Sequence, residues 1–313
     1  MLGKTAGGLF WMFRFLERSE NTARLLDAGF RIALTRSSAA ENEWASVVAT
    51  AGVAQSYKQK YDHYDSRNVI DFLLRDRLNS SSVMSVIDAA RNNARMVRTA
   101  LTREVWEATN DCWINLKELL SQPISERDLP DVLGTIRQQS ALVRGALHGT
   151  MLRNDVFDFA RIGTFLERAD NTARILDVKY YVLLPSASFV GSSLDNVQWE
   201  SILRSVSAQR AFRWLNPGEV NPMSIAEFII LDRRLPRSLV FCYSKIVDNL
   251  RYLEEDYGLT LECHNRAAPI LKRLKESTVH SIFEEGLHEF ITSFLQDNMA
   301  LGGQIEQDYR FNG

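Results

Sequence analysis

Apolar residues recur along most of the chain at positions i, i+3, i+4 and i+7, the spacing of one face of an α-helix. The chain contains only seven prolines and sixteen glycines, so few residues interrupt this pattern. No run of alternating apolar and polar residues indicates a β-strand. The pattern therefore predicts an all-α protein, a bundle of about ten helices of which several are long.

The predicted helices begin and end at residues that typically cap or break helices. Suitable N-terminal caps are Ser81 or Ser82, Thr102, Ser125 and Asn221. A loop is predicted at 186–193, and the polar tail after 302 is expected to be loose. The predicted helices span residues 9–35, 41–53, 66–78, 82–100, 102–120, 126–149, 155–184, 195–215, 224–232, 237–257, 263–277 and 281–309.

One thirteen-residue segment occurs twice, 150 residues apart. Residues 15–27 are FLERSENTARLLD and residues 165–177 are FLERADNTARILD, with ten of the thirteen positions identical. A hydrophobic core requires only apolar residues at helical spacing, yet here the polar positions match as closely as the apolar ones. Something beyond packing therefore fixes the polar pattern of both segments. Outside this motif, the two halves of the chain show no alignment by eye.

On a helix, the polar residues of the first motif fall on one arc, and the same arc of the second motif is also polar. Phe10 and Phe13 precede this arc in the first copy, and Ala160 and Gly163 precede it in the second. A solvent face is not normally bordered by apolar and small residues. We therefore expect both polar faces to be buried and to face each other across an internal groove.

Buried charges must be paired. Glu20 and Arg24 are four residues apart, as are Asp170 and Arg174, which favours ion pairs along each helix. Further cations are expected from a third segment, in which Arg91, Arg95 and Arg98 share a helical arc; we predict that they pair with Glu17 or Glu167. Glu104 and Trp106 would close the end of the groove.

Composition adds little to this picture. The content of 45% hydrophobic and 24% charged residues is ordinary for a globular protein, and a net charge of −2 gives no indication of nucleic-acid or membrane binding. Three scattered cysteines form neither a disulfide framework nor a zinc motif, which favours the cytoplasm. No apolar stretch is long enough to cross a membrane. A helical body of this size often pairs, so a homodimer is compatible with the sequence.

The sequence gives only weak support for a metal or cofactor site. A di-metal carboxylate bundle needs two Glu-x-x-His pairs, and the chain offers one, Glu285 with His288, where an exposed or capping histidine is the preferred interpretation. An all-oxygen magnesium site built from carboxylates of the two motifs remains open, although the nearby arginines oppose it. Phosphate-binding loops and nucleophile elbows are absent from the sequence, and we expect no cofactor. The run Arg233, Arg234 and Arg237 is interpreted as a solvated surface.

At these residues the chain resembles the alpha-E domain proteins of bacteria, which are all-helical. The segments that match are ERSENTARLLD at 17–27, ARNNARMVRTALTREVWEATN at 90–110, RIGTFLERADNTARILDVKYYVLLP at 161–185 and ILDRRLPRS at 230–238. The resemblance covers nearly the whole chain. It implies one helical domain over 1–313, within which we distinguish a motif-bearing bundle at 1–185 and a helical extension at 186–313.

The resemblance also implies partners. Alpha-E proteins are often encoded beside, or fused to, a circularly permuted ATP-grasp protein, and transglutaminase-like peptidases often accompany them. This implies service to a peptide- or amide-forming system. No catalytic residue is established for the family, so only the motif positions transfer as candidates.

Three interpretations of the motif remain open: a buried salt-bridge network, a groove that binds a peptide or partner segment, and a catalytic centre. The first choice is an accessory binding protein of an ATP-grasp ligase, in which Arg24, Arg174 and Arg95 bind carboxylate or phosphate. The alternative is an enzyme with Glu17 and Glu167 as acid and base. The candidate residues are Glu17, Arg18, Glu20, Asn21, Arg24, Asp27, Arg91, Arg95, Arg98, Glu104, Trp106, Glu167, Arg168, Asp170, Asn171, Arg174 and Asp177.

Overall fold

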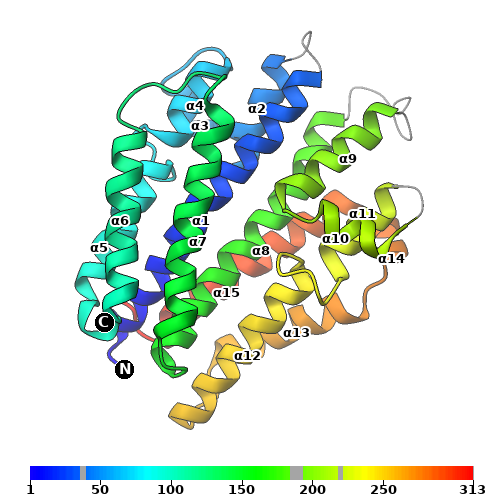
Figure 1. Cartoon of the computed structure of the whole chain (residues 1–313). Coiled ribbons are helices and arrows are strands. Elements are labelled where there is room, and N and C mark those ends of the chain that lie inside the picture. The colour runs from blue at the N-terminus through cyan, green and yellow to red at the C-terminus, as the bar shows by residue number, and fades with distance from the viewer. Residues whose placement is uncertain (36–39, 184–192, 218–220, 313) are drawn as a thin grey trace.

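The computed structural model describes residues 1–35, 40–183, 193–217 and 221–312, and every regular element in them is a helix. The first half contains α1 (Gly3–Thr35), α2 (Ala40–Thr50), α3 (Ala54–Lys58), α4 (Ser66–Leu74), α5 (Val83–Met96), a 3-10 turn η2 (Arg98–Ala100), α6 (Arg103–Leu119) and α7 (Leu129–Thr150). The second half contains α8 (Asp155–Leu183), α9 (Ser193–Ser205), α10 (Gln209–Leu215), α11 (Pro222–Leu231), α12 (Leu239–Tyr257), α13 (Glu262–Glu276), α14 (Val279–Glu285) and α15 (Leu287–Asp308). The predicted all-α class is confirmed (Figure 1).

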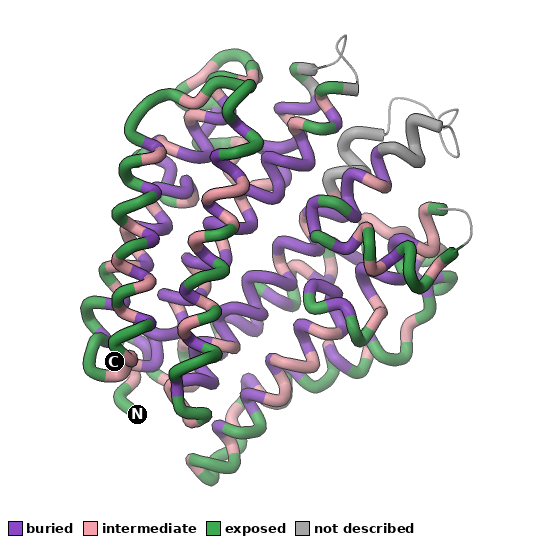
Figure 2. The backbone as a smooth tube through the Cα atoms, viewed as in Figure 1, coloured by how far each residue is buried: buried purple, intermediate pink, exposed green. Residues whose placement is uncertain are grey.

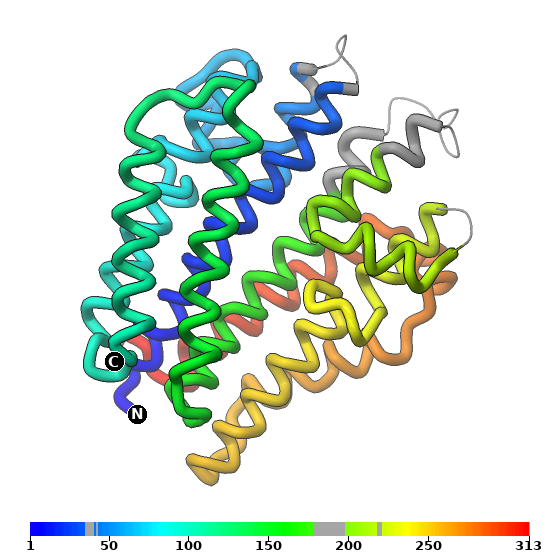
Figure 3. The backbone as a smooth tube through the Cα atoms, viewed as in Figure 1, coloured from blue at the N-terminus to red at the C-terminus, as the bar shows by residue number. Residues whose placement is uncertain are grey.

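Two long helices, α1 and α8, form the centre of the molecule and pack directly against each other. Both are buried on almost every side along the described residues, whereas α5, α6, α7, α12 and α13 expose one face to solvent (Figure 2). Figure 3 shows α5 and α6 on one side of this central pair, and α12 and α13 on the other. The two motif-bearing helices therefore lie together, as predicted.

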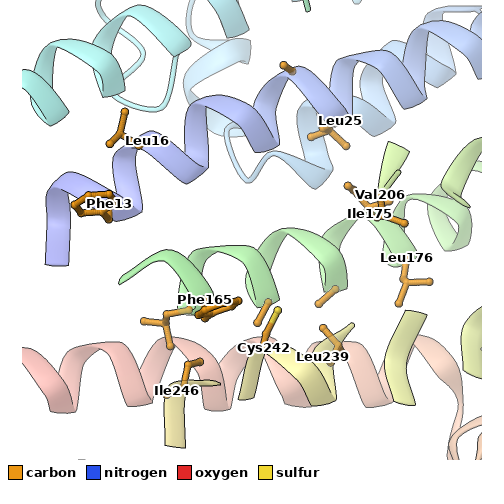
Figure 4. Close-up of a cluster of buried hydrophobic side chains, with 14 of the residues drawn as sticks. Phe13, Leu16, Leu25, Phe165, Ile175, Leu176, Val206, Leu239, Cys242 and Ile246 are labelled. Carbon is orange, nitrogen blue, oxygen red and sulfur yellow. The ribbon is translucent and has the colours of Figure 1, made fainter. Parts of the chain in front are cut away.

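Apolar side chains on the two central helices anchor the outer helices. Figure 4 shows Phe165 of α8 beside Cys242 and Ile246 of α12, and Phe13 and Leu16 on α1. All five side chains are buried. Burial of each large apolar side chain contributes about 1.5–3 kcal/mol, so this shared core fixes how the outer helices lie on the central ones.

A close approach of backbones joins the central helices. A methyl group at Gly163 would overlap the carbonyl oxygen of Phe10, so only glycine lets α8 lie this near to α1. This contact lies about one helical turn before the Glu-Arg dipeptide of the second motif, because Glu167 follows Gly163 by four residues. This contact brings the polar side chains of both motifs within reach of one another.

The two halves of the molecule repeat one arrangement of helices. Helices α1, α5, α6 and α7 pack on one another in the same pairs as α8, α12, α13 and α15, and α2 and α9 each pack across onto the opposite central helix. Local features match as well. Ser82 and Ser238 cap α5 and α12, and Gly52 and Ser207 follow α2 and α9 with positive φ. The halves, which show no alignment by eye outside the motif, are therefore alike in how their helices pack.

The same correspondence extends to buried side chains. Trp44 of α2 and Trp199 of α9 are both buried, and each lies six residues before the last residue of its helix. The sequences of the two halves look different outside the motif for a physical reason. Residues of the outer helices need only a suitable size and polarity, so different side chains can give the same packing.

Three differences from the expected helices concern breaks and ends. The predicted helix 195–215 is two helices, separated where Ser207 has a φ of 57°, and the predicted helix 281–309 is divided at Gly286 with a φ of 101°. The tail after 302 is not loose, because α15 continues to Asp308 and Phe311 packs against Phe10. The loop expected at 186–193 lies mostly outside the described residues.

Candidate functional site

The centre of the site is a reciprocal exchange between the two copies of the motif. Arg168 of α8 donates two hydrogen bonds to Glu17 of α1, at 2.8 and 2.9 Å, and Arg18 of α1 donates two to Glu167 of α8, at 2.5 and 2.9 Å. Each Glu-Arg dipeptide therefore pairs with the other one. Forked arginine–carboxylate bonds are among the strongest hydrogen bonds in proteins and also fix orientation, so these two pairs set the register of α1 against α8.

More arginines surround Glu17, and two of them come from outside the motif-bearing helices. Arg144 of α7 and Arg237, just before α12, lie 3.2 and 3.1 Å from the Glu17 carboxylate, and both also pair with Glu20. Arg24 completes this group through Glu20 at 2.7 Å. We call this group the first cluster; its members are Glu17, Glu20, Asn21, Arg24, Arg144, Arg168 and Arg237.

The equivalent group on α8 has fewer cations. Arg14 and Arg18 pair with Glu167, and Arg174 pairs with Asp170 at 2.6 Å. We call this group the second cluster; its members are Arg14, Arg18, Glu167, Asp170, Asn171 and Arg174. Both expected i,i+4 pairs, Glu20 with Arg24 and Asp170 with Arg174, are confirmed.

The glutamates are buried and remain ionised. Glu17 is 1% exposed and Glu167 is 5% exposed. Burial alone would raise the pKa of Glu17, but Arg168, Arg237 and Arg144 outweigh it and hold that pKa well below its usual value. Burial opposes Arg18 and Arg14 at Glu167 in the same way, and the arginines lower the pKa of Glu167 to about 2. Neither carboxylate is poised to exchange protons near neutral pH.

These lowered pKa values predict a loss of stability in acid. A carboxylate whose pKa is lower in the folded state stabilises that state above its unfolded pKa, and this contribution is lost as the pH falls through the folded value. For Glu167 the window runs from about pH 4.5 down to about pH 2. We expect Glu167→Gln to remove a pH-dependent contribution on the order of 3 kcal/mol from this window.

The measurement is the free energy of unfolding in urea at pH 7, 5, 4 and 3, followed by circular dichroism. Glu107→Gln is the matched control, because Glu107 forms an exposed ion pair with Arg103. Parallel pH profiles for wild type and Glu167→Gln would contradict a buried, arginine-bound Glu167.

The arginines of the two motifs also bind the ends of neighbouring helices. Arg24 donates to the carbonyl of Ser205, the last residue of α9, and Arg174 donates to the carbonyl of Thr50, the last residue of α2. A cation at a helix C-terminus is stabilising, because the last carbonyl groups have no partner within the helix. Arg24 and Arg174 are therefore already occupied by protein groups.

The two aspartates that end the motifs have different partners. Asp27 pairs with Arg31 at 3.0 Å and lies 3.6 Å from Arg137. Asp177 pairs with His288, at 2.6 Å, at the start of α15. The interpretation of His288 as an exposed or simple capping residue is therefore wrong; its ring nitrogen joins α15 to α8.

The predicted pairing of the α5 arginines with the motif glutamates is wrong. Ala90 and Ala94 are the small residues that face the core, so the arginines beside them point outward. Arg91 donates to Asn110 at 2.8 Å and lies over the ring of Trp113, and Arg95 is exposed.

The expected end of the groove is likewise on the surface. Glu104 is exposed, and Trp106 lies under the guanidinium of Arg98, with 5.2 Å between the ring centroid and Cζ. Arg98 and Trp106 border a surface cavity of about 520 Å³ whose lining contains no residue of either cluster. They belong to the contact between α5 and α6, away from the glutamates.

A cavity opens directly beside the first cluster. It has a volume of about 290 Å³, and Arg144 and Arg168, two of the cations that bind Glu17, lie in its wall. Arg161 adds a third guanidinium. Its full lining is Arg144, Gly145, Leu147, His148, Arg161, Thr164, Phe165, Arg168, Pro236 and Phe241.

Arg161 differs from the other two arginines, because among the described residues it forms no ion pair with a carboxylate. It contacts Nε2 of His148 at 3.2 Å, and its own Nε is buried without a hydrogen-bond partner. Burial, and then the charges of Arg168 and Arg153, lower the pKa of Arg161 to about 10. The guanidinium remains charged at neutral pH, and the nearby carboxylates of Asp158 and Asp248 favour that charge.

Asp158 lies on the other side of Arg161, in a second cavity of about 360 Å³. Burial, together with the charges of Asp256 and Asp155, raises the pKa of Asp158 to about 7. This carboxyl group therefore changes protonation near neutral pH, unlike the motif glutamates. Lys245, Asp248 and Tyr252 also line this cavity.

Sequence reasoning missed five residues of the site: Arg14, Arg144, Asp158, Arg161 and Arg237. Arg14 and Arg161 could have been found, since each shares a helical face with its motif. Arg237 was expected on a solvated surface; instead it is 6% exposed and binds the first cluster, while Arg233 and Arg234 are exposed as expected. Arg144 and Arg237 arrive from distant helices, and only the tertiary structure brings them to Glu17.

In the part of the chain that the structure describes, no group of three or more His, Cys, Asp or Glu side chains has the arrangement of a metal site. No described helix is long and apolar enough to cross a membrane. The three cysteines are free and buried.

Comparison with known proteins identifies one family. Residues 1–309 match the family model Alpha-E, described as a predicted alpha-helical domain with a conserved ER motif. In this chain the reciprocal pairs are formed by two such dipeptides, Glu17–Arg18 and Glu167–Arg168. No curated protein and no solved structure matches the chain. Because the match covers nearly its whole length, the chain belongs to the Alpha-E family.

Proposed function

We propose that this protein is an accessory binding protein of a peptide- or amide-forming system, and that it binds the carboxylate of a peptide or amino-acid derivative. The observation that supports this is the cavity beside the first cluster, where Arg161 has no carboxylate partner among the described residues. The charged groove of the motifs is thus proposed to be this arginine-lined cavity, with the two clusters as its supporting frame.

The balance of charge favours an anionic ligand. The first cluster holds two carboxylates against the guanidinium groups of Arg24, Arg144, Arg168 and Arg237. Arg161 adds another positive charge next to them. Cations crowded in a partly buried site repel one another, and a bound anion removes part of that repulsion.

The geometry of the lining favours a carboxylate attached to an apolar group. A guanidinium presents two parallel N–H donors that match the two oxygens of a carboxylate or a phosphate. Phe165, Phe241 and Leu147 add an apolar surface to the lining. Binding sites of this kind commonly combine an apolar wall with a few fixed polar groups, and a peptide-like acid satisfies both.

An accessory role follows from the state of the glutamates. Arginines hold Glu17 and Glu167 as anions, so neither is suited to transfer protons near neutral pH. Glu17 instead orients Arg144 and Arg168 in the wall of the cavity. The expected partner is an ATP-grasp ligase-like protein in the cytoplasm, with a transglutaminase-like peptidase as a further partner. Co-purification of an ATP-grasp protein with the tagged chain, identified by mass spectrometry, supports this partner; its absence from the native host's extract contradicts it.

The test of the cavity compares two probes that differ only in charge, N-acetylglycine and N-acetylglycinamide, by isothermal titration calorimetry. We expect only the carboxylate to bind, and Arg161→Gln to weaken its affinity by at least about tenfold. Arg213→Gln is the control, because Arg213 forms an exposed ion pair with Glu200. Equal binding of both probes, or unchanged affinity in Arg161→Gln, would refute the proposal.

A second candidate is a carboxylate-based enzyme, and one observation favours it. The pKa of Asp158 near 7 is suited to acid–base chemistry at neutral pH, and the side chain lies in a cavity. The lowered pKa values of Glu17 and Glu167 do not support an enzyme that uses these two residues as acid and base. Stoichiometric metal in the purified protein, lost on Glu17→Gln and Glu167→Gln, would favour the enzyme.

A further inference from the structure

The two clusters occupy equivalent places in the two similar halves of the molecule. Only the first cluster contains an arginine from the loop before an outer helix, and this arginine is Arg237. Arg237 lies immediately before Ser238, the N-cap of α12. It donates to Oδ1 of Asn21 at 3.2 Å and pairs with Glu20 at 2.5 Å. Helix α12 packs on α8, so Arg237 reaches from there across to α1.

Ser81 occupies the equivalent position in the first half. It lies immediately before Ser82, the N-cap of α5, and α5 packs on α1 as α12 packs on α8. Asp76 and Asp232 support the correspondence, because each accepts a backbone N–H two residues further along the same loop. From this relation we expect Ser81 to face the second cluster on α8. A serine side chain is too short to replace a guanidinium there.

The second cluster shows the consequence of this missing arginine. Asn171 is the counterpart of Asn21; it is 8% exposed, and its Oδ1 is buried without a hydrogen-bond partner. A buried polar atom without a partner costs about 1–3 kcal/mol. The carboxylates of Glu167 and Asp170 have three guanidinium groups around them, whereas those of Glu17 and Glu20 have four.

Three residues of the second cluster are more exposed to solvent than their counterparts in the first. The Asp170 side chain is 22% exposed, against 1% for its counterpart Glu20. Arg174 is 35% exposed against 10% for Arg24, and Arg18 is 25% exposed against 10% for Arg168. The cluster that contains Arg237 therefore shields Glu20 and Arg24 more fully than the second cluster shields Asp170 and Arg174.

We infer that the second cluster is a binding site for a guanidinium group from another molecule, which takes the place that Arg237 occupies in the first cluster. Asn171 Oδ1 accepts one N–H and Asp170 accepts others, as Asn21 and Glu20 do for Arg237. The ligand chemistry is that of an arginine side chain. This inference goes beyond the proposed function, which concerns an anion in a different cavity.

The test uses N-acetyl-L-argininamide, with N-acetyl-L-citrullinamide as the uncharged isostere and N-acetyl-L-lysinamide as a cation of different shape. Binding is followed by isothermal titration calorimetry. We expect the arginine probe to bind at least about tenfold more tightly than either of the others. Equal affinity for citrulline would overturn the site, and equal affinity for lysine would overturn its assignment to guanidinium.

Ser81→Arg tests the repeat relation directly. Its own guanidinium should occupy the site, weaken the arginine probe at least about tenfold and raise the melting temperature. Ser80→Arg is the control, since the exposed Ser80 corresponds to Pro236, which does not bind the first cluster through a side chain. Unchanged affinity in a folded Ser81→Arg protein would overturn the inference.

Asn171→Leu covers the case in which Ser81→Arg does not fold. It removes the unpartnered oxygen, and we expect it to weaken the arginine probe by the same order while circular dichroism stays that of the wild type. Arg161→Gln should leave this binding unchanged, so failure here and failure of the proposed carboxylate site give different results. Full affinity in Asn171→Leu would overturn the inference.

Discussion

Glu17→Gln is expected to lower the free energy of unfolding by about 3–5 kcal/mol, because it leaves the buried Arg168 without its carboxylate partner and leaves Arg144 and Arg237 with Glu20 alone. Arg168, Arg144 and Arg237 all lie within 3.2 Å of the Glu17 carboxylate, which is 1% exposed. Glutamine keeps the volume of glutamate, so the loss measures the charge and not a cavity. Chemical denaturation followed by circular dichroism gives the value.

Glu107→Gln serves as the matched control. Glu107 also pairs with an arginine, Arg103, but both side chains are largely exposed. Exposed ion pairs contribute about 0–1 kcal/mol, so the control should change little. A loss below about 1 kcal/mol for Glu17→Gln would mean that solvent or rearrangement compensates the arginines, contrary to a closed buried cluster.

Gly163→Ala is expected to destabilise the protein by about 1–3 kcal/mol, because the added methyl group would overlap the Phe10 carbonyl oxygen. The obstacle is backbone and not a flexible side chain, so α1 and α8 must move apart. The pairs Glu17–Arg168 and Glu167–Arg18 lie close along the same helices and would lengthen with that movement. The free energy of unfolding and the acid profile of the variant report both effects.

Gly134→Ala is the control for helix propensity. Gly134 lies inside α7 with no atom within 4 Å of an added methyl group. Alanine is favoured over glycine in a helix by about 1 kcal/mol, so this variant should be neutral or more stable. If Gly163→Ala behaved like Gly134→Ala, the close approach of the central helices would be disproved.

The long helices were predictable because their apolar spacing and their caps agree. Ser82 and Thr102 cap α5 and α6, and Asn221 caps α11 ahead of Pro222, each as expected from residue type. The breaks at Ser207 and Gly286 were missed. Apolar spacing continues through both, and a single residue with positive φ leaves no periodic signal.

The inward orientation of the motifs was also predictable, because apolar residues border the polar arc on helices with no polar outer face. The arginines that pair with the motif glutamates from outside α1 and α8 could not be predicted. Arg144 and Arg237 come from α7 and from the loop before α12, far from Glu17 in sequence. Arg91, Arg95 and Arg98 have an equally suitable spacing, but Ala90 and Ala94 take the core side of α5. Spacing alone does not show which face of a helix meets which neighbour.

The two clusters differ in the residues that complete them. The first is complete within the chain, since α7 and the α11–α12 loop supply Arg144 and Arg237. The second relies on Arg14 in place of a residue from α15, where Gly302 lies next to Leu166 and near Arg14. The two halves thus share their central ion pairs but differ in the residues around them.

A double-mutant cycle on Glu17 and Arg168 tests the central claim, that the two copies of the motif are joined by buried charge pairs between α1 and α8. The unfolding free energies of wild type, Glu17→Gln, Arg168→Met and the double variant give the coupling energy between the two side chains. The account predicts a coupling of about 2 kcal/mol or more, within the range observed for residues in one network. A coupling below about 0.5 kcal/mol, no larger than that of distant and independent sites, would contradict it.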